Sequence, residues 1–262
     1  MKKFVFLLSD FGTKDYYVAA MKSVILSIFP DAKIIDITHE VQKFNVFEGA
    51  LILKQILKYI PTGSVVVGVV DPGVGTKRKS IIIKTRYHYF VGPDNGLFSL
   101  VAKEEGIERI IEITNERYML ERTGTFDGRD VFAPVAAYIL RGVDIEKFGK
   151  ELDKIEELCL PQPIFTATSI SCEILHVDSF GNLITNIPAS RFFEWAENRE
   201  YFSLTVKRKK YKVSLSHSYG EAKTSLFLIK GSSELIEISM NKASAAKNLN
   251  VKAGDKLRIE KL

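Results

Sequence analysis

The sequence is short of the residues on which several classes of protein depend. It has only two cysteines, Cys159 and Cys172, in 262 residues, which argues against a disulfide framework and against a metal site built on thiolates. Its four histidines are scattered, and no pair of them has the spacing of metal ligands. Aspartates at loop tips still leave a site for a hard cation possible.

Long apolar runs are also missing, and no stretch approaches the roughly 20 residues of a membrane span. The first apolar run, Phe4–Leu8, is interrupted at once by Ser9, Asp10 and Gly12, with no small-residue cleavage site. It is therefore typical of a buried strand and not of a signal peptide. We expect a cytoplasmic protein that does not bind membranes.

An excess of one charge is lacking as well, because 37 basic residues are nearly balanced by 32 acidic ones. The densest basic run, Lys207–Lys210, lies between two alternating segments and has no interleaved aromatic residues that would stack on bases. This pattern is typical of a solvated hairpin turn. We expect no nucleic-acid partner.

Common catalytic motifs are absent. The sequence has no Gly-x-Ser-x-Gly elbow for a nucleophilic serine. Gly73-x-Gly75 lacks the third glycine of a dinucleotide-binding loop, and no Gly-Lys-Ser/Thr phosphate loop occurs. Chemistry based on carboxylates and guanidinium groups remains.

What the first part of the chain does contain is an alternation of apolar runs with segments of helical spacing. We predict strands at Phe4–Leu8, Lys33–Ile37, Ser64–Val70, Ser80–Lys84, His88–Val91 and Glu108–Ile113, and helices at Tyr16–Phe29, Asn45–Tyr59 and Leu97–Glu105. Such alternation predicts a mainly parallel sheet with helices on both faces. Asn45 and Glu48 are expected to form a capping box, and Asp130 to cap a helix that runs to Leu140.

Beyond Pro161-Gln162-Pro163 the pattern changes to short alternating segments separated by Gly, Asn and Ser. With little helix between them, these segments predict a smaller all-β domain, a barrel or a sandwich. We therefore expect an α/β domain over residues 1–163 and a β-barrel-like domain over residues 164–262.

Three polar loops of the first domain, residues 9–13, 71–78 and 125–130, combine carboxylates with glycine. Ligands of open α/β sheets bind beyond the carboxyl ends of the strands, and glycine lets the backbone approach a ligand closely. Asp71 and Arg78 lie seven residues apart around a glycine-rich turn. Arg78 could keep Asp71 ionised to orient a water molecule, or the pair could simply pin the loop; spacing alone favours neither.

A series of motifs runs along nearly the whole chain: Leu8–Gly12, Asp36–His39, Phe47–Ala50, Val70–Thr76, Gly92–Gly96, Thr125–Asp130, Asp178–Asn182 and Ser232–Ala243. Each alone is weak, but their order and spacing are specific. The chain resembles the S-adenosylmethionine hydroxide adenosyltransferases, or S-adenosylmethionine hydrolases, which are relatives of the fluorinating and chlorinating enzymes.

The resemblance implies an α/β domain and a β-barrel-like domain, and a homotrimer whose ligand lies between the first domain of one subunit and the second domain of its neighbour. It also implies that a water-derived oxygen attacks ribose C5′ of S-adenosylmethionine and releases adenosine and methionine, with no metal or other cofactor. Asp71 matches the catalytic aspartate of the family, and Arg78 its arginine. Because halide-using relatives have an uncharged residue at the position of Asp71, we predict hydrolysis without halogenation.

Asp127 departs from the family pattern, which has histidine at this position in a Thr-Phe-His-Gly-Arg-Asp motif. If its carboxylate approaches that of Asp71, one pKa rises and the pair could share a proton. Alternatively, Arg78 bridges both carboxylates. We place Asp127 in the catalytic group with Asp71 and Arg78, and the sequence leaves its role open.

The resemblance further implies a set of substrate-binding residues. Asp10 matches the acceptor for the ribose hydroxyls, and Phe44 matches an aromatic that packs near the ribose and the sulfonium. We expect Phe126 to line the same pocket. Asp178 and Asn182 match groups near the methionine end, Phe180 matches an adenine-stacking position, and Ser232 and Glu237 lie in the closing segment that contacts the ligand. Two other readings stay open. One is a protein that binds S-adenosylmethionine or adenosine without turnover, and the other is a metal-dependent phosphohydrolase that acts on a nucleotide.

Overall fold

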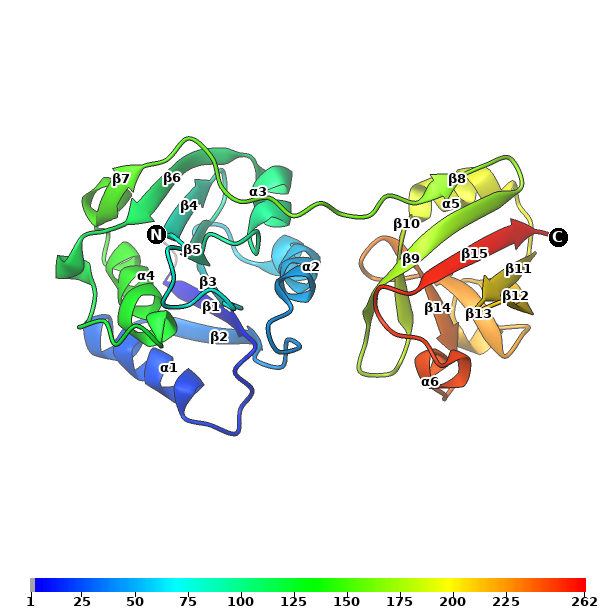
Figure 1. The fold of residues 1–262 in the computed structure, drawn as a ribbon, viewed down its shortest axis with the longest axis horizontal. Helices are drawn as coiled ribbons and strands as arrows, with labels where there is room; N and C mark the ends of the chain where they lie inside the picture. Colours follow the sequence, from blue (N-terminus) through cyan, green and yellow to red (C-terminus); the bar gives the residue numbers. More distant parts are fainter. Residues whose placement is uncertain (1–2) are drawn as a thin grey trace. The chain divides into compact units, whose positions relative to one another are not determined.

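The apolar runs of the first part of the chain form one sheet of seven strands (Figure 1). The computed structural model describes residues 3–262, which divide between Leu158 and Cys159 into two units. The boundary drawn from the sequence, at residue 163, lies in the irregular segment between strand β7 (Gly149–Glu151) and strand β8 (Ile164–Phe165).

Most strands of this first sheet run in one direction. They are β1 (Phe4–Ser9), β2 (Lys33–Thr38), β3 (Val65–Val69), β4 (Ser80–Thr85), β5 (Tyr89–Pro93), β6 (Ile107–Ile113) and β7, in the spatial order β2-β1-β3-β5-β4-β6-β7. The pairs β1–β2, β1–β3 and β3–β5 are parallel. The pairs β4–β5, β4–β6 and β6–β7 are antiparallel, so only β4 and β7 are reversed. The predicted mainly parallel sheet is confirmed.

Helices cover both faces of the sheet, as the alternation predicts. They are α1 (Tyr17–Ile28), α2 (Val46–Ile56), α3 (Ser99–Glu105) and α4 (Ala133–Leu140), with short 3-10 turns at Leu57–Tyr59, Glu116–Tyr118 and Ile145–Phe148. Along β1, Val5 and Leu7 join the core that contains α1 and α4, whereas Phe6 and Leu8 join the core that contains α2 and α3. The two cores follow from the alternation of side chains along a strand.

The helix starts near the polar loops differ in part from the sequence prediction. Asn45 Oδ1 accepts a hydrogen bond from Glu48 N at 3.1 Å and caps α2, as predicted. Glu48 Oε2 also accepts from Gln42 N at 3.0 Å, and Asn45 N donates to the Gln42 carbonyl at 2.9 Å. The prediction that Asp130 caps a helix was wrong. Gly128–Phe132 form a π-helical turn before α4, so Asp130 lies inside the helical segment and its carboxylate binds the side chains of Thr123 and Arg129 instead.

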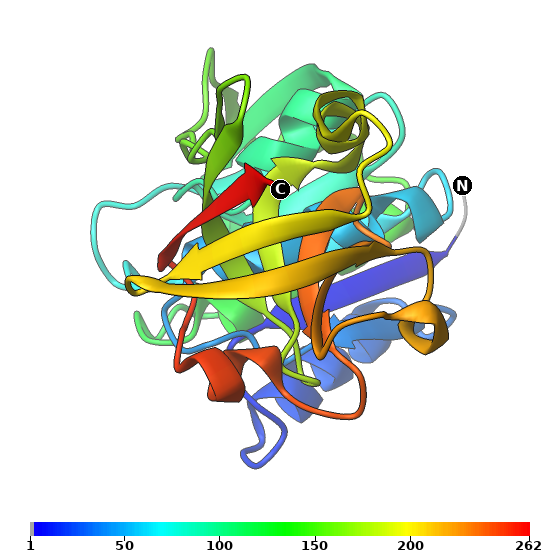
Figure 2. The same cartoon turned by 90° about the vertical axis from the view of Figure 1, so that its right-hand side faces the viewer.

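The second unit is a closed barrel with two short helices (Figure 2). Its strands are β8, β9 (Ser169–Val177), β10 (Leu183–Pro188), β11 (Tyr201–Val206), β12 (Lys209–Ser216), β13 (Leu226–Lys230), β14 (Leu235–Met240) and β15 (Lys256–Lys261), and its helices are α5 (Ala189–Ala196) and α6 (Ala245–Leu249), with a 3-10 turn at Tyr219–Glu221. The order β10-β14-β13-β12-β11-β15-β9 closes because β9 also pairs with β10, and β8 adds to β9. The predicted barrel-like domain is confirmed.

The basic run Lys207–Lys210 lies at a hairpin of the barrel, as the sequence predicted. The basic run forms the turn between β11 and β12, where Lys207 and Arg208 adopt φ angles of 46° and 69°, which suits a two-residue hairpin. The barrel encloses an apolar core that includes Ile174, Phe202 and Leu228. Across residues 3–262, no helix is both long enough and apolar enough to span a membrane.

Candidate active site

A pocket of about 340 Å³ opens beyond the ends of β1 and β3 in the first unit. All three polar loops contribute to it. Its lining comprises Asp10, Phe11, Asp15, Tyr17, Lys43, Phe44, Val69, Asp71, Val74, Thr125, Phe126, Asp127 and Gly128. A site at the carboxyl ends of parallel strands is where open α/β sheets bind their ligands, and it brings Asp10, Phe44, Asp71, Phe126 and Asp127 together.

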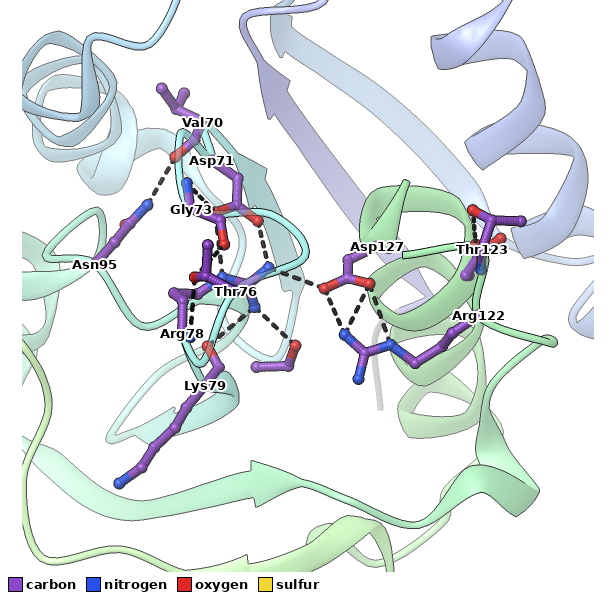
Figure 3. A network of polar contacts seen from close by, with 12 residues as sticks. Val70, Asp71, Gly73, Thr76, Arg78, Lys79, Asn95, Arg122, Thr123 and Asp127 are labelled. Atoms are coloured by element: carbon purple, nitrogen blue, oxygen red, sulfur yellow. Dashed lines mark hydrogen bonds and ion pairs between the residues drawn. The ribbon is translucent and has the colours of Figure 1, made fainter. Parts of the chain in front are cut away.

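Asp71 and Arg78 form a buried bidentate pair at this pocket (Figure 3). Arg78 Nε donates to Asp71 Oδ1 at 3.1 Å, and Nη2 donates to Oδ2. Gly73 N also donates to Oδ1, at 3.2 Å. Only 5% of the Asp71 side chain and 7% of the Arg78 side chain are exposed, so water screens their attraction little. The pair both pins the loop and offers a buried carboxylate to the pocket.

The pKa of Asp71 is set by opposing effects. Burial raises this pKa, the negative charge of Asp127 adds to the rise, and Arg78 opposes both; the net result lies above the ordinary value of 3.8. The carboxyl group is therefore a stronger base than a solvated aspartate, although Arg78 favours its ionised form.

Asp127 meets Arg78 from the opposite loop. Arg78 Nη2 donates to Asp127 Oδ2 at 2.9 Å, so this one nitrogen bridges the carboxylates of Asp71 and Asp127. Of the arrangements left open by the sequence, bridging by arginine is the one observed. Arg78 is held on its other side by Ser80 Oγ, which accepts from Nη1 at 2.9 Å. Its guanidinium carbon also lies 5.6 Å from the ring centre of Phe132.

Arg122 is a site residue that sequence reasoning missed. Its Nε and Nη2 atoms donate to Asp127 Oδ1 at 3.2 and 3.0 Å, and Nη2 also donates to Oδ2 at 2.8 Å (Figure 3). Because the Asp127 side chain is only 1% exposed and shares Arg78 with Asp71, a second cation nearby offsets its buried charge. The available signal was an arginine five residues earlier in the chain, just before the polar loop of residues 125–130.

The two carboxylates differ in how many of their acceptor positions are occupied. A carboxylate has about four such positions. The four contacts from Arg122 and Arg78 fill those of Asp127. Asp71 receives three donors, two on Oδ1 and one on Oδ2. The described residues therefore leave Asp71 Oδ2 able to accept one more hydrogen bond, such as one from water, whereas Asp127 is saturated.

Close contact between two loops supports this network. Gly75 has φ of +77°, and a Cβ atom added there would lie 2.7 Å from the carbonyl oxygen of Gly124. Glycine thus lets the loop of Asp71 lie directly against the loop that joins Arg122 to Asp127. Any larger residue at this position would push the two halves of the network apart.

Asp10 and Phe44 are joined at the rim of the same pocket. Asp10 is buried, and its Oδ2 accepts from Phe44 N at 2.8 Å, while Lys43 Nζ donates to the Asp10 carbonyl. Phe44 has φ of +65°, which is uncommon for a bulky residue and marks a strained position. The residue is 70% exposed. Hydrogen bonding to Asp10 holds this strained backbone, so an aromatic face stands free at the pocket.

The remaining predicted residues lie in the second unit. Asp178 Oδ1 accepts from the backbone N–H groups of Phe180 and Asn182, and Oδ2 accepts from Asn182 Nδ2 at 2.9 Å. This ordered turn leaves Phe180 80% exposed, at a pocket of about 530 Å³ that Phe180 and Asn182 both line. Burial, together with the charge of Asp178, raises the pKa of Glu237 to about 7. Ser232 is exposed in the turn before β14.

Comparisons with known proteins agree with this architecture. The model of the SAM hydroxide adenosyltransferase N-terminal domain matches residues 5–149, and that of the C-terminal domain matches residues 172–258. The chain belongs to this family. It is 40% identical to the (R)-S-adenosyl-L-methionine hydrolase of Methanocaldococcus jannaschii, with 97% of this chain and 94% of that protein covered. It is 28% identical to the fluorinase of an Actinoplanes species, with 69% and 70% covered.

Solved structures extend the likeness to the fold. A crystal structure of an uncharacterized conserved protein from Thermotoga maritima is 38% identical, with a TM-score of 0.92 over 98% of this chain and all of that one. A conserved hypothetical protein from Thermus thermophilus is 32% identical, with a TM-score of 0.78 over 98% of this chain and all of that one. The family membership therefore rests on the matches of both domains and on the named relatives, and the solved structures show that the fold recurs.

Proposed function

We propose that this member of the SAM hydroxide adenosyltransferase family hydrolyses S-adenosylmethionine to adenosine and L-methionine. The observation that carries the proposal is the buried Asp71 carboxylate, which is fixed by Arg78 and retains one acceptor position at the pocket. Relatives that are 32% to 40% identical over nearly the full length bear the name (R)-S-adenosyl-L-methionine hydrolase, which supports the same assignment.

The chemistry needs a nucleophile and a base but no acid. A water molecule that donates to Asp71 Oδ2 attacks ribose C5′ in line with the C5′–S bond. The oxygen–carbon bond forms as the carbon–sulfur bond breaks, and sulfur keeps the electron pair as a neutral thioether. The proton of the water passes to Asp71 and then to solvent. Because the leaving group is uncharged, positioning and desolvation of the water are the main tasks of the protein.

Asp10 and Phe44 suit the ribose end of the substrate. The carboxylate of Asp10 uses Oδ2 to hold the backbone of Phe44, and we propose that Oδ1 accepts from a ribose hydroxyl. The exposed Phe44 ring then packs against the sugar and the sulfonium, whose positive charge favours an aromatic face. Phe126 lines the same pocket. We propose that Asp178, Phe180, Asn182, Ser232 and Glu237 of the second unit bind the methionine and adenine ends.

The proposal includes a reaction that requires no metal or other cofactor. It is supported by the occupation of seven of the eight acceptor positions of Asp71 and Asp127 by N–H donors, which leaves little room for a cation between them. Activity that survives a chelator is the expected result, and activity that requires added divalent metal would favour a phosphohydrolase. A homotrimer and a cytoplasmic location, both expected from the sequence, belong to the same proposal and stay predictions.

The decisive experiment incubates the purified protein with S-adenosylmethionine and measures adenosine and methionine by chromatography. The Asp71→Asn variant should lose about 100- to 10,000-fold in kcat, because an amide cannot accept the proton of water. Asp153→Asn, at an exposed position of the same unit, serves as the matched control and should retain full activity. Tight binding of S-adenosylmethionine without product from the wild-type protein would instead identify a binding protein.

A further inference from the structure

The ion pair between Arg122 and Asp127 has no role in the reaction as proposed above. The Arg122 guanidinium makes three donations to this one carboxylate. The Arg122 side chain is 46% exposed, whereas that of Asp127 is 1% exposed. Arg122 does not line the pocket. Whatever it contributes to the reaction must therefore pass through Asp127.

Asp127 in turn acts on Arg78 and not on water. With its four acceptor positions occupied, it has none left to orient a nucleophile. Its one contact toward the reacting group is Oδ2, which accepts from Arg78 Nη2 at 2.9 Å. The same nitrogen donates to Asp71 Oδ2, the atom that retains an acceptor position. Asp127 thus fixes the direction from which Arg78 approaches Asp71.

The four side chains linked by these contacts alternate in charge, and their charges sum to zero. Arg122, Asp127, Arg78 and Asp71 follow one another as cation, anion, cation and anion. Without Arg122, a single guanidinium would be shared by two buried carboxylates. The pull of Arg78 on Asp71 would then be divided, and the uncompensated charge of Asp127 would act on Asp71 in full.

We propose that Arg122 is a positioning residue for the hydrolysis of S-adenosylmethionine: it neutralises and holds Asp127, so that Asp127 fixes Arg78 against the water-orienting carboxylate of Asp71. The inference rests on the proposed function for its kinetic meaning. Its geometry does not depend on that function, because it consists of contacts among four side chains of the protein itself.

The first test compares Arg122→Gln with the wild type in the pH dependence of kcat. The acid limb should move to higher pH by about one unit, because Asp71 loses part of its compensation, and kcat near neutral pH should fall about 10-fold with little change in KM. Arg122→Lys should recover part of the loss. Arg117→Gln, at an exposed position of the same unit, is the control. Asp10, Asp15 and Lys43 are other charged residues that line the pocket. They are unchanged in every variant, so their presence does not explain a difference in the acid limb between variants.

A uniform loss of activity at every pH, without a shift of the acid limb, would show a merely structural role and overturn the proposal. So would a kcat of Arg122→Gln equal to that of the wild type. A double-mutant cycle adds a second criterion. Adding Arg122→Gln to Asp127→Asn should change kcat less than 2-fold beyond Asp127→Asn alone, because Arg122 acts through Asp127. Effects that multiply would contradict this pathway.

A third measurement separates this inference from the proposed function. The carboxyl carbon of Asp71 is titrated by NMR in the wild type and in Arg122→Gln, without substrate. A higher pKa for Asp71 in the variant supports the inference even if the wild-type protein fails to hydrolyse S-adenosylmethionine. An unchanged pKa refutes it even if hydrolysis is observed.

Discussion

Asp71 and Asp127 show how the surroundings of a side chain decide its role. Both are buried aspartates that bind Arg78. Asp71 keeps an acceptor position on Oδ2, but Asp127 uses all of its positions on two arginines. The first can orient water and the second can only orient Arg78. An aspartate at position 127, where the sequence resemblance implies histidine, therefore leaves Asp71 as the carboxylate with an acceptor position for water.

At the scale of single residues, the sequence predicted those site residues that lie in recognisable motifs. Asp10, Asp71 and Asp127 each follow a strand or precede a helical turn, and the fold brings them to one pocket. Arg122 was missed because a polar loop that contains arginine looks the same whether the side chain points to solvent or to a buried carboxylate. The direction of the Arg122 side chain depends on the path of the backbone between residues 119 and 127, which the sequence does not reveal.

The first prediction concerns the pH dependence of the wild-type enzyme. Asp71 must be ionised to accept the proton of water, and burial raises its pKa above 3.8. Activity should therefore fall as the pH decreases through a value higher than that of a solvated aspartate. The pH profile of kcat measures this limb. A limb that follows the ordinary pKa of aspartate would contradict a buried base.

The second prediction concerns the choice of nucleophile. The carboxylate of Asp71 repels an anion at the place where the nucleophile must stand. Wild-type protein with S-adenosylmethionine in chloride of molar concentration should yield adenosine and no 5′-chloro nucleoside by mass spectrometry. Chloride-dependent formation of the chlorinated product would refute the proposed role of Asp71.

The third prediction concerns Glu237 and stability. Its pKa is about 7 in the folded protein and ordinarily 4.5, so the folded state binds the proton more tightly and ionisation opposes folding. The free energy of unfolding should decrease as the pH rises from 4.5 to 7. Glu237→Gln should remove this loss and be more stable relative to wild type at about pH 8 than at about pH 5. The gain should be about 1 kcal/mol, because the group is partly solvated. Denaturant titrations at both pH values measure it, and equal differences would contradict it.

At the scale of elements, loops carry more of the site than helices do. The π-helical turn Gly128–Phe132 follows Asp127 and was not predicted, because the sequence pattern indicated a single helix that begins after Asp130 and runs to Leu140. A single π-helical turn does not change the spacing of apolar residues enough to be recognised in the sequence. Its backbone geometry places Asp130 on Thr123 and Arg129, which orders the loop that carries Arg122.

The fourth prediction belongs to the contact between two such loops. Gly75→Ala should place a methyl group against the Gly124 carbonyl and force a left-handed backbone on alanine. We expect kcat to fall about 10-fold or more, with a stability loss of about 1 kcal/mol. Gly142→Ala is the control, because Gly142 has a similar φ of +86° but open space around it. It should lose similar stability and keep its activity. Equal activity of both variants would show that the contact has no role in the site.

At the scale of the whole molecule, the class of each unit was predictable but its topology was not. Alternating strands and helices indicated the mainly parallel sheet. The position of β4 between β5 and β6, antiparallel to both, could not be inferred, because the tight β4–β5 connection fixes pairing but not the next neighbour. Likewise, short alternating strands suited a barrel or a sandwich equally, and only the β9–β10 pairing closes the barrel.

The fifth prediction is the assembly. One chain has a mass of 29.5 kDa, and the predicted homotrimer should have a mass near three times that value. Light scattering coupled to gel filtration measures it. A mass that stays at that of one chain at every concentration would contradict the trimer and require a site completed without a second subunit.

Closure of the barrel has a consequence for the chain outside its native state. β9 pairs with β15 along one side, and its other side is shared by β10 near Val177 and by β8 near Ile170. The two residues of β8 thus occupy the stretch of edge that β10 leaves uncovered. A ring of strands completed in this way offers few unpaired backbone groups to a neighbouring chain. The second unit should therefore resist aggregation as long as β8 stays paired with β9.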